Sequence, residues 1–191
     1  MRYPPEHKVE TRRKIVKDAA SRVRIEGLNG AAVSAVMRDA GLTHGGFYKH
    51  FGDKNELLME SVQECFRDTS ARLVAAAEHS KPAAAWKAII RTYLSPEHCD
   101  HPEVGCPLAA LAPELARTGR ANRPRILEEV ENYKARMLPF MPGRRKIDKE
   151  RAFFAIFSTM IGAVAIARIL PDQESRVAVL ANARDLLLRS F

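Results

Sequence analysis

At 191 residues, the chain is long enough for one or two domains with a sizeable hydrophobic core. Its net charge of +8 and its pI of about 9.7 favour a polyanionic partner. Three widely spaced cysteines argue against a secreted disulfide framework, and the N-terminus is polar where a signal peptide would be apolar. We therefore expect a cytoplasmic protein.

The positive charge is concentrated near the N-terminus. Residues 1–54 hold 11 Lys and Arg against 6 Asp and Glu, a surplus of 5, whereas the other 137 residues hold 20 against 17, a surplus of 3. A basic segment of this kind is the electrostatic footprint of a nucleic-acid-binding module.

The first helix is expected from about His7 to Glu26, after a flexible arm at Met1–Pro5. Apolar residues recur on one face of this helix at helical spacing, and Gly27 ends it. Its first turns carry four basic residues that could approach DNA phosphates: Lys8, Arg12, Arg13 and Lys14.

Two short helices joined by a tight turn are predicted over residues 33–51. Gly41 suits the end of the first helix, because glycine adopts the left-handed C-cap conformation without steric cost. Thr43 can accept a backbone N–H bond and cap the second helix, over residues 44–51. Asp53 is placed to cap a long third helix.

The side chains left exposed on the second helix suit the edge of a nucleic acid. They are polar, basic or very small, and none is acidic. In a helix-turn-helix, the second helix enters the major groove and its N-terminal residues meet the base edges. The predicted DNA-binding residues are Arg12, Ser34, Thr43, His44, Gly45, Tyr48, Lys49, His50 and Lys54.

The stretch AGLTHGGFYKHFGDKNELL, residues 40–58, resembles the DNA-binding signature of the TetR family of transcriptional regulators. The glycine turn, the aromatic pair Phe47 and Tyr48, and Phe51 carry this resemblance. It implies an all-α fold of about nine helices, with a helix-turn-helix domain over 1–56 and an effector-binding and dimerisation domain over 57–191. It also implies a homodimer without enzymatic activity that binds a pseudo-palindromic DNA operator. The protein would most simply be a repressor, and a small effector would release it from the operator.

The rest of the chain has the spacing of helices, and its sequence contains no strand pattern. The third helix is expected to continue to about His79, and Pro82 suits the first turn of the next helix. Further helices are predicted at 83–94, at 106–117 with a kink at Pro113, at 120–141, at 147–170 and at 172–189, with a loop over 95–105.

Residues 152–167 form an apolar run without a charged residue. As a helix this run would span roughly 24 Å, which is shorter than the ~30 Å hydrocarbon core of a membrane. We therefore expect a helix buried in protein.

The last two helices have wider apolar faces than a surface helix needs. One interpretation is that they pack only within their own chain. The other is that they pair with a second copy, in the four-helix interface that the resemblance implies, so that two recognition helices lie about 34 Å apart. The predicted interface residues are Phe153, Phe157, Met160, Ile161, Val164, Leu180, Arg184 and Leu187.

The resemblance also implies a small-molecule pocket among the middle helices. The same side chains are equally what an ordinary helical core requires, so both interpretations stay open. The candidate pocket residues are Phe66, Trp86, Tyr93, Cys106, Leu111, Tyr133 and Met137.

The loop from His98 to Cys106 offers an alternative function as a redox or metal sensor, or as the site of a small helical enzyme. Its Cys and His spacing matches no common zinc pattern, so we expect neither a metal nor a cofactor. Cys106 would begin a helix, where the helix dipole lowers a thiol pKa, and His101 or His98 could add positive charge. The competing interpretation is that Cys106 is simply a small buried residue.

Overall fold

The computed structural model describes the chain from residue 5 onward. Residues 1–4 of the predicted arm lie outside this part, and Pro5 already belongs to the first helix. The described part is helical without strands, which confirms the all-α prediction. Its α-helices are α1 (Pro5–Gly30), α2 (Val33–Asp39), α3 (Lys54–Glu78), α4 (Ala85–Tyr93), α5 (Pro96–Asp100), α6 (Pro107–Arg117), α7 (Arg123–Met137), α8 (Lys146–Ala167) and α9 (Gln173–Ser190), and its short 3-10 helices are η1 (His44–Lys49), η2 (Pro82–Ala84), η3 (Pro102–Val104) and η4 (Leu138–Phe140).

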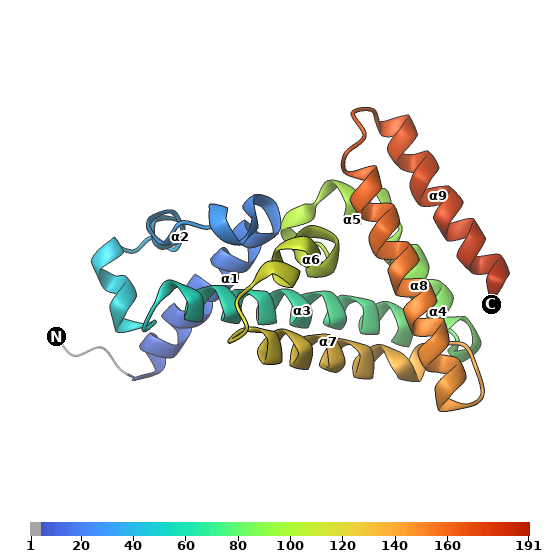
Figure 1. Ribbon diagram of the computed structural model, residues 1–191, viewed down its shortest axis with the longest axis horizontal. Coiled ribbons are helices and arrows are strands. Elements are labelled where there is room, and N and C mark those ends of the chain that lie inside the picture. The colour runs from blue at the N-terminus through green and yellow to red at the C-terminus, as the bar shows by residue number, and fades with distance from the viewer. Residues whose placement is uncertain (1–4) are drawn as a thin grey trace.

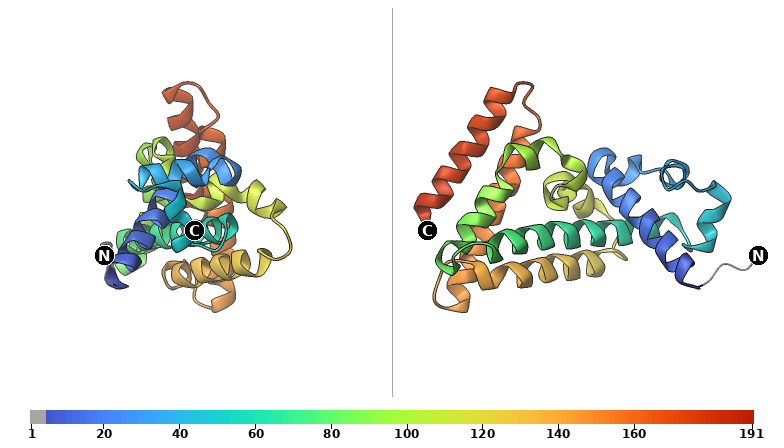
Figure 2. Two further views of the ribbon diagram at one scale, coloured as in Figure 1. Left: turned by 90° about the vertical axis from the view of Figure 1, so that its left-hand side faces the viewer. Right: turned by 180° about the vertical axis from the view of Figure 1, so that it is seen from behind.

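The molecule is elongated, and α3 forms its central spine (Figure 1). At one end α1 packs against α3, and α2 packs against α1 and η1. Along the rest of its length α3 contacts α4 and α7, while α8 and α9 form a hairpin at the opposite end (Figure 2). The N-terminal module and the α8–α9 hairpin are therefore joined by one continuous helix, without a flexible linker.

The turn between α2 and η1 forms as the sequence predicts. Gly41 has a φ of 75°, and its N–H donates to the carbonyl of Arg38, while the N–H of Leu42 donates to that of Met37. These two bonds are the Schellman arrangement that closes a helix C-terminus.

The second helix differs from the prediction in two respects. It is the 3-10 helix η1, which ends at Lys49, rather than a helix reaching residue 51. Thr43 occupies the N-cap position, but its hydroxyl accepts no backbone N–H there. Asp53, by contrast, caps α3 as predicted, because its carboxylate accepts the N–H of Glu56 at 2.7 Å.

The buried side chains form two separate clusters. The smaller belongs to the N-terminal module, and the larger fills the rest of the molecule. Along α3 the smaller cluster ends at Leu57 and the larger begins at Met59. Along α1 the smaller cluster ends at Ala19 and the larger begins at Ala20. The smaller cluster contains Ile15, Val16, Ala19, Val36, Met37, Ala40, Phe47, Phe51 and Leu57.

The α1 helix breaks at Gly27, where the sequence predicts its end. The backbone there has a φ of 77°, and the N–H of Leu28 donates to the carboxylate of Glu114 on α6 at 2.7 Å. The φ favours glycine, and a Cβ at Gly27 would lie 2.5 Å from Glu114 Oε1 and would displace this carboxylate from its contact. This contact ties the N-terminal module to α6.

The prediction of a loop over residues 95–105 is wrong in part. Ser95 accepts the N–H of His98 and caps α5, and η3 follows directly. Each of these helices has only one turn, which is too short for a periodic apolar pattern, so neither helix could be predicted from periodicity.

The α8 helix is long and apolar enough to cross a membrane by length and composition. Eight of its residues are buried in the larger cluster, including Phe153, Phe157 and Met160. A core helix passes the same test of composition, and this burial is what the sequence analysis expected of residues 152–167.

Candidate nucleic-acid interface

The η1 helix presents a polar and aromatic surface above a buried aromatic base. Phe47 is 2 % exposed and stacks on Phe51, with ring centroids 5.4 Å apart. Tyr48, the next residue, is 72 % exposed and meets the Phe47 ring edge-on at 5.2 Å. Because the buried ring fixes η1, the side chains of Tyr48, Lys49 and His44 are held outward from a rigid support.

Gly45 leaves the N-terminal part of η1 open. A Cβ built on this residue would meet no atom within 4 Å, and its φ is not positive. Neither packing nor backbone conformation therefore requires glycine in the isolated protein. The absence of a side chain here lets another molecule approach the backbone closely.

His50 is only partly exposed and lies at the C-cap of η1. Its buried Nδ1 has no hydrogen-bond partner among the residues from Pro5 onward, and its pKa is lowered by burial first and then by the nearby charges of Lys8, Arg12, Lys49 and His7. A phosphate placed here would supply both a hydrogen-bond acceptor and a compensating negative charge.

Arg12 has a different role from the predicted phosphate contact. Its guanidinium pairs with Glu56 at 2.6 Å and with Glu60, and it lies 4.2 Å above the Phe51 ring. These partners neutralise the charge and tie α1 to α3. Lys14 is also engaged, since its ammonium donates to the carbonyl of Ala40 at the end of α2.

The remaining predicted DNA-binding residues lie at helix ends on the surface of the same module. Ser34 is exposed in the first turn of α2, Thr43 is exposed at the start of η1, and Lys54 is exposed at the start of α3. N-terminal ends of helices favour anions, because their backbone N–H groups are free and the helix dipole is positive there.

A cavity of about 580 Å³ separates the first turns of α1 from η1. Its walls include His7 and Thr11, which the sequence analysis did not select as DNA contacts. The sequence could have predicted that His7 and Thr11 line this cavity beside Lys8, because residues 7, 8 and 11 share one face of a helix. The lining residues are His7, Lys8, Thr11, Leu42, Thr43, Gly46, Lys49 and His50.

The predicted effector-pocket residues are all buried in the larger cluster. The structure brings Tyr93, Tyr133 and Cys106 into mutual electrostatic contact, and the Phe66 ring lies 5.8 Å from that of Tyr133. Trp86 packs edge-on against Phe191 at the other end of α4. Leu111 and Met137 complete the buried set.

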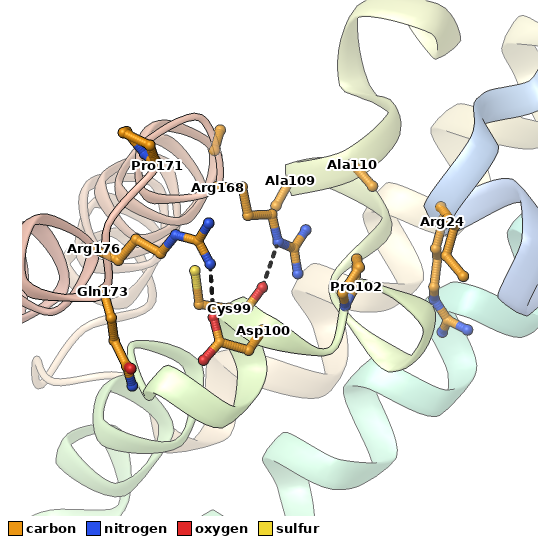
Figure 3. Close-up of a pocket in the computed structure, with 12 residues that line it drawn as sticks. Arg24, Cys99, Asp100, Pro102, Ala109, Ala110, Arg168, Pro171, Gln173 and Arg176 are labelled. Carbon is orange, nitrogen blue, oxygen red and sulfur yellow. Dashed lines mark hydrogen bonds and ion pairs between the residues drawn. The ribbon is translucent and has the colours of Figure 1, made fainter.

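A cavity of about 620 Å³ lies elsewhere, between α1, α5, α6, α8 and the start of α9 (Figure 3). Arg168 on its wall donates to the carbonyls of Cys99 and His98, at 3.0 and 2.9 Å. Arg176 reaches Asp100 at 3.5 Å. Both guanidinium groups hold α5 in place, and neither residue was selected from the sequence.

The loop from His98 to Cys106 has a structural role that the sequence did not reveal. His98 Nδ1 lies 2.6 Å from the carbonyl of Tyr93, and its Nε2 accepts the N–H of Cys106 at 3.0 Å. This pair of bonds fixes the tautomer with the proton on Nδ1. Burial lowers the pKa of His98 to about 4, with the charges of Arg168 and Arg72 acting in the same direction, so the ring is neutral.

The imidazole groups do not converge on the Cys106 thiol as the sensor hypothesis required. His98 is neutral and bonds to the Cys106 backbone, while His101 is exposed and pairs with Glu103 at 3.0 Å. Cys106 itself is 0 % exposed. Within the described residues, no group of three or more His, Cys, Asp and Glu is placed to hold a metal ion.

The predicted dimer residues face mostly inward. Phe153, Phe157, Met160, Val164, Leu180 and Leu187 are buried within their own chain, and only Ile161 and Arg184 are partly exposed. This part of the prediction is corrected: α8 is apolar on nearly all sides, so the sequence could not show which stripe faces its own core. The large apolar side chains that α8, α9 and their connection leave exposed are Ile147, Phe154, Ile166, Ile169, Val177 and Leu186.

Comparisons with known proteins agree with this geometry. Residues 17–60 match the family described as "Bacterial regulatory proteins, tetR family". No curated protein matches the sequence significantly.

Several solved structures share the fold over nearly the whole chain. A TetR transcriptional regulator from Chloroflexus aurantiacus J-10-FL is 24% identical, with a TM-score of 0.75 over 95% of this chain and 94% of that one. A TetR-family regulator from Cytophaga hutchinsonii is 19% identical, with a TM-score of 0.77 over 97% of both chains. The reduced form of NemR from E. coli is 15% identical, with a TM-score of 0.75 over 93% and 95%.

The fold and the N-terminal module are of the kind found in helix-turn-helix transcriptional regulators. The matched segment includes α2, η1 and the start of α3, which are the elements that present Tyr48 and Lys49. The chain has the DNA-binding domain and the fold of the TetR family of transcriptional regulators.

Proposed function

We propose that the chain is a homodimeric, cytoplasmic repressor that binds a pseudo-palindromic DNA operator and is released from it by a small effector. The observation that carries the DNA-binding part is the rigid placement of η1. Phe47 and Phe51 anchor this helix in the smaller cluster, and Tyr48 and Lys49 project from it. We place the domain boundary in the first turns of α3, where the two buried clusters meet.

The interface of the proposed dimer is the outer face of α8 and α9. Phe154, Ile166 and Ile169 are 56 %, 54 % and 81 % exposed, and Leu186 on α9 is 60 % exposed. Large apolar side chains left exposed on one helical hairpin favour an interaction surface there. A symmetric partner with the same face would cover them and would present two copies of η1 to successive major grooves.

The effector would act on DNA binding through α6. This helix begins at Cys106 in the core of the C-terminal half and carries Glu114, which holds the α1 backbone at Leu28. On the neighbouring turn, Arg24 of α1 donates to the carbonyls of Glu103 and Cys65 at 3.2 and 3.0 Å. A displacement of α6 or η3 would therefore shift the orientation of the DNA-binding module.

Binding to the DNA upstream of the protein's own gene tests the proposal. Fluorescence anisotropy across a salt series should show saturable binding whose affinity falls steeply as salt rises. Lys49→Ala should weaken binding to all sequences and reduce the salt slope by about one unit, because one phosphate contact is lost.

Lys146→Ala is the matched control, because this exposed lysine begins α8 at the other end of the molecule. It should leave both affinity and slope unchanged. An unchanged affinity and slope for Lys49→Ala would show that η1 does not lie on the phosphate backbone as proposed.

A further inference from the structure

A small polar cluster lies inside the aromatic core of the C-terminal half. It consists of the hydroxyls of Tyr93 on α4 and Tyr133 on α7 and the thiol of Cys106, and none of these residues is more than 2 % exposed. The Tyr93 ring meets those of His98 and Phe157 edge-on, at 4.5 and 6.2 Å. The Tyr133 ring meets Phe157 in the same way at 5.3 Å.

Within the described part of the chain, neither phenol hydroxyl makes a hydrogen bond of regular geometry, and each has only a weak side-chain interaction with the Cys106 thiol. The same thiol interacts with both hydroxyls, and both phenol rings contact Phe157, so the two tyrosines share one neighbourhood in the core. A thiol is a weak hydrogen-bonding group and does not replace a proper acceptor. Buried polar groups are nearly always paired, and two neighbouring hydroxyls that share only a thiol indicate a place where a further molecule binds.

The chemistry of the cluster specifies what it would bind. Two O–H groups can donate to a single acceptor oxygen, while His98 is already occupied by Tyr93 and Cys106 backbone groups. Burial raises the pKa of both phenols well above the ordinary value, so both keep their protons. The rings of Phe66, Phe153 and Phe157 lie against the phenols, so the part of a ligand away from the two donors would meet an apolar wall.

We infer that Tyr93 and Tyr133 form the effector site and that the effector is a small neutral apolar molecule whose carbonyl oxygen accepts both hydroxyl hydrogen bonds. This inference rests on the proposed function, since it names the ligand of the same regulator. The two donors fix the oxygen, and the rings of Phe66 and Phe157 cover the apolar remainder of the ligand.

A route to the cluster lies between α3 and α7. Tyr133 and Phe66 form part of the wall of a surface cavity of about 200 Å³, and the hydrogen bond from Arg136 to Ser70, at 3.0 Å, crosses the same seam. The cavity is smaller than the roughly 300 Å³ at which drug-sized sites begin. A ligand that enters by this route would therefore be of single-ring size.

The position of the cluster explains how its occupant would reach the DNA-binding module. Cys106 is the N-cap of α6, and Glu114 on the same helix holds the N–H of Leu28. An oxygen bound between the two tyrosines would lie against the start of α6. Its binding would therefore act on the helix that orients α1.

The first test uses stability alone. Tyr93→Phe and Tyr133→Phe each remove an unpaired hydroxyl and keep the ring, so each variant should resist urea at least as well as the parent protein. A lower unfolding midpoint in either variant would show that the hydroxyls are already paired in the free protein, and the inference would then be overturned.

The second test uses acetophenone as the probe, with ethylbenzene as its isostere without the oxygen and benzoate as its anionic counterpart. Acetophenone should raise the unfolding midpoint of the parent protein and shift the fluorescence of the single tryptophan, Trp86, saturably. Each Tyr→Phe variant should bind it at least fivefold more weakly. Tyr48→Phe is the control, because Tyr48 is exposed on η1 and should not affect ketone binding.

The outcomes separate this inference from the proposed function. Equal binding of ethylbenzene or benzoate, no binding of acetophenone at millimolar concentration, or unchanged affinity in both Phe variants would each overturn the assigned ligand class. Operator binding by the ligand-free protein tests the repressor function independently. Failure of operator binding with retained ketone binding would instead overturn the repressor proposal.

Discussion

His98 should make the protein sensitive to mild acid. In the folded state burial lowers its pKa from 6.5 to about 4, and the groups that face it from α1, α3 and α8 are the cations Arg24, Arg72 and Arg168. The unfolded chain has no such environment, so its histidine keeps an ordinary pKa. Between these two pKa values the unfolded state binds one more proton than the folded state, and stability must fall as the pH falls.

The size of the effect follows from the same two pKa values. Stability is unaffected by His98 well above pH 6.5 and declines through the interval down to pH 4. At about 1.4 kcal/mol per pH unit, the whole interval amounts to about 3 kcal/mol, of which about 2 kcal/mol is lost between pH 7 and pH 5. For a chain of this size that loss lowers Tm by roughly 4–8 °C.

Urea unfolding at pH 7 and pH 5, at constant ionic strength, measures this loss directly. His98→Gln keeps one donor and one acceptor but cannot titrate, so its stability should change much less between the two pH values. The variant is expected to be less stable than the parent protein at pH 7, because an amide fills the imidazole site imperfectly. A parent protein equally stable at both pH values, or a variant with the same pH dependence, would refute the reasoning.

Two further predictions concern the outer surfaces. Phe154→Glu should leave the monomer folded and abolish the dimer in sedimentation, because Phe154 is exposed. Phe157→Glu would bury an unpaired charge and should unfold the chain, at a cost of several kcal/mol. If the Phe154 variant formed a folded dimer, the interface would have to lie elsewhere. Gly45→Ala should change unfolding stability by less than about 1 kcal/mol yet weaken operator binding, while Gly27→Ala should destabilise the fold because of its φ and its contact with Glu114. Unchanged operator affinity in the Gly45 variant would show that DNA does not approach its backbone.

The sequence by itself determined the local features of the DNA-binding module. Gly41 and Asp53 act over a few residues, and the turn and the cap form where the sequence predicts them. Glycine conformation, capping and short-range periodicity depend on neighbours in the chain, which are visible in the sequence. The same local signals located α3 and the break at Gly27.

Only the tertiary structure decided which partners distant residues find. Arg12 appeared free to reach DNA, but it lies against Glu56 and Glu60, more than 40 positions away. Likewise, Phe154 and Phe157 are equally apolar neighbours on α8, yet one is exposed and the other buried. A helix that is apolar on nearly all sides gives no preference for either stripe, so its orientation is set by α4, α6 and α9, which pack against it.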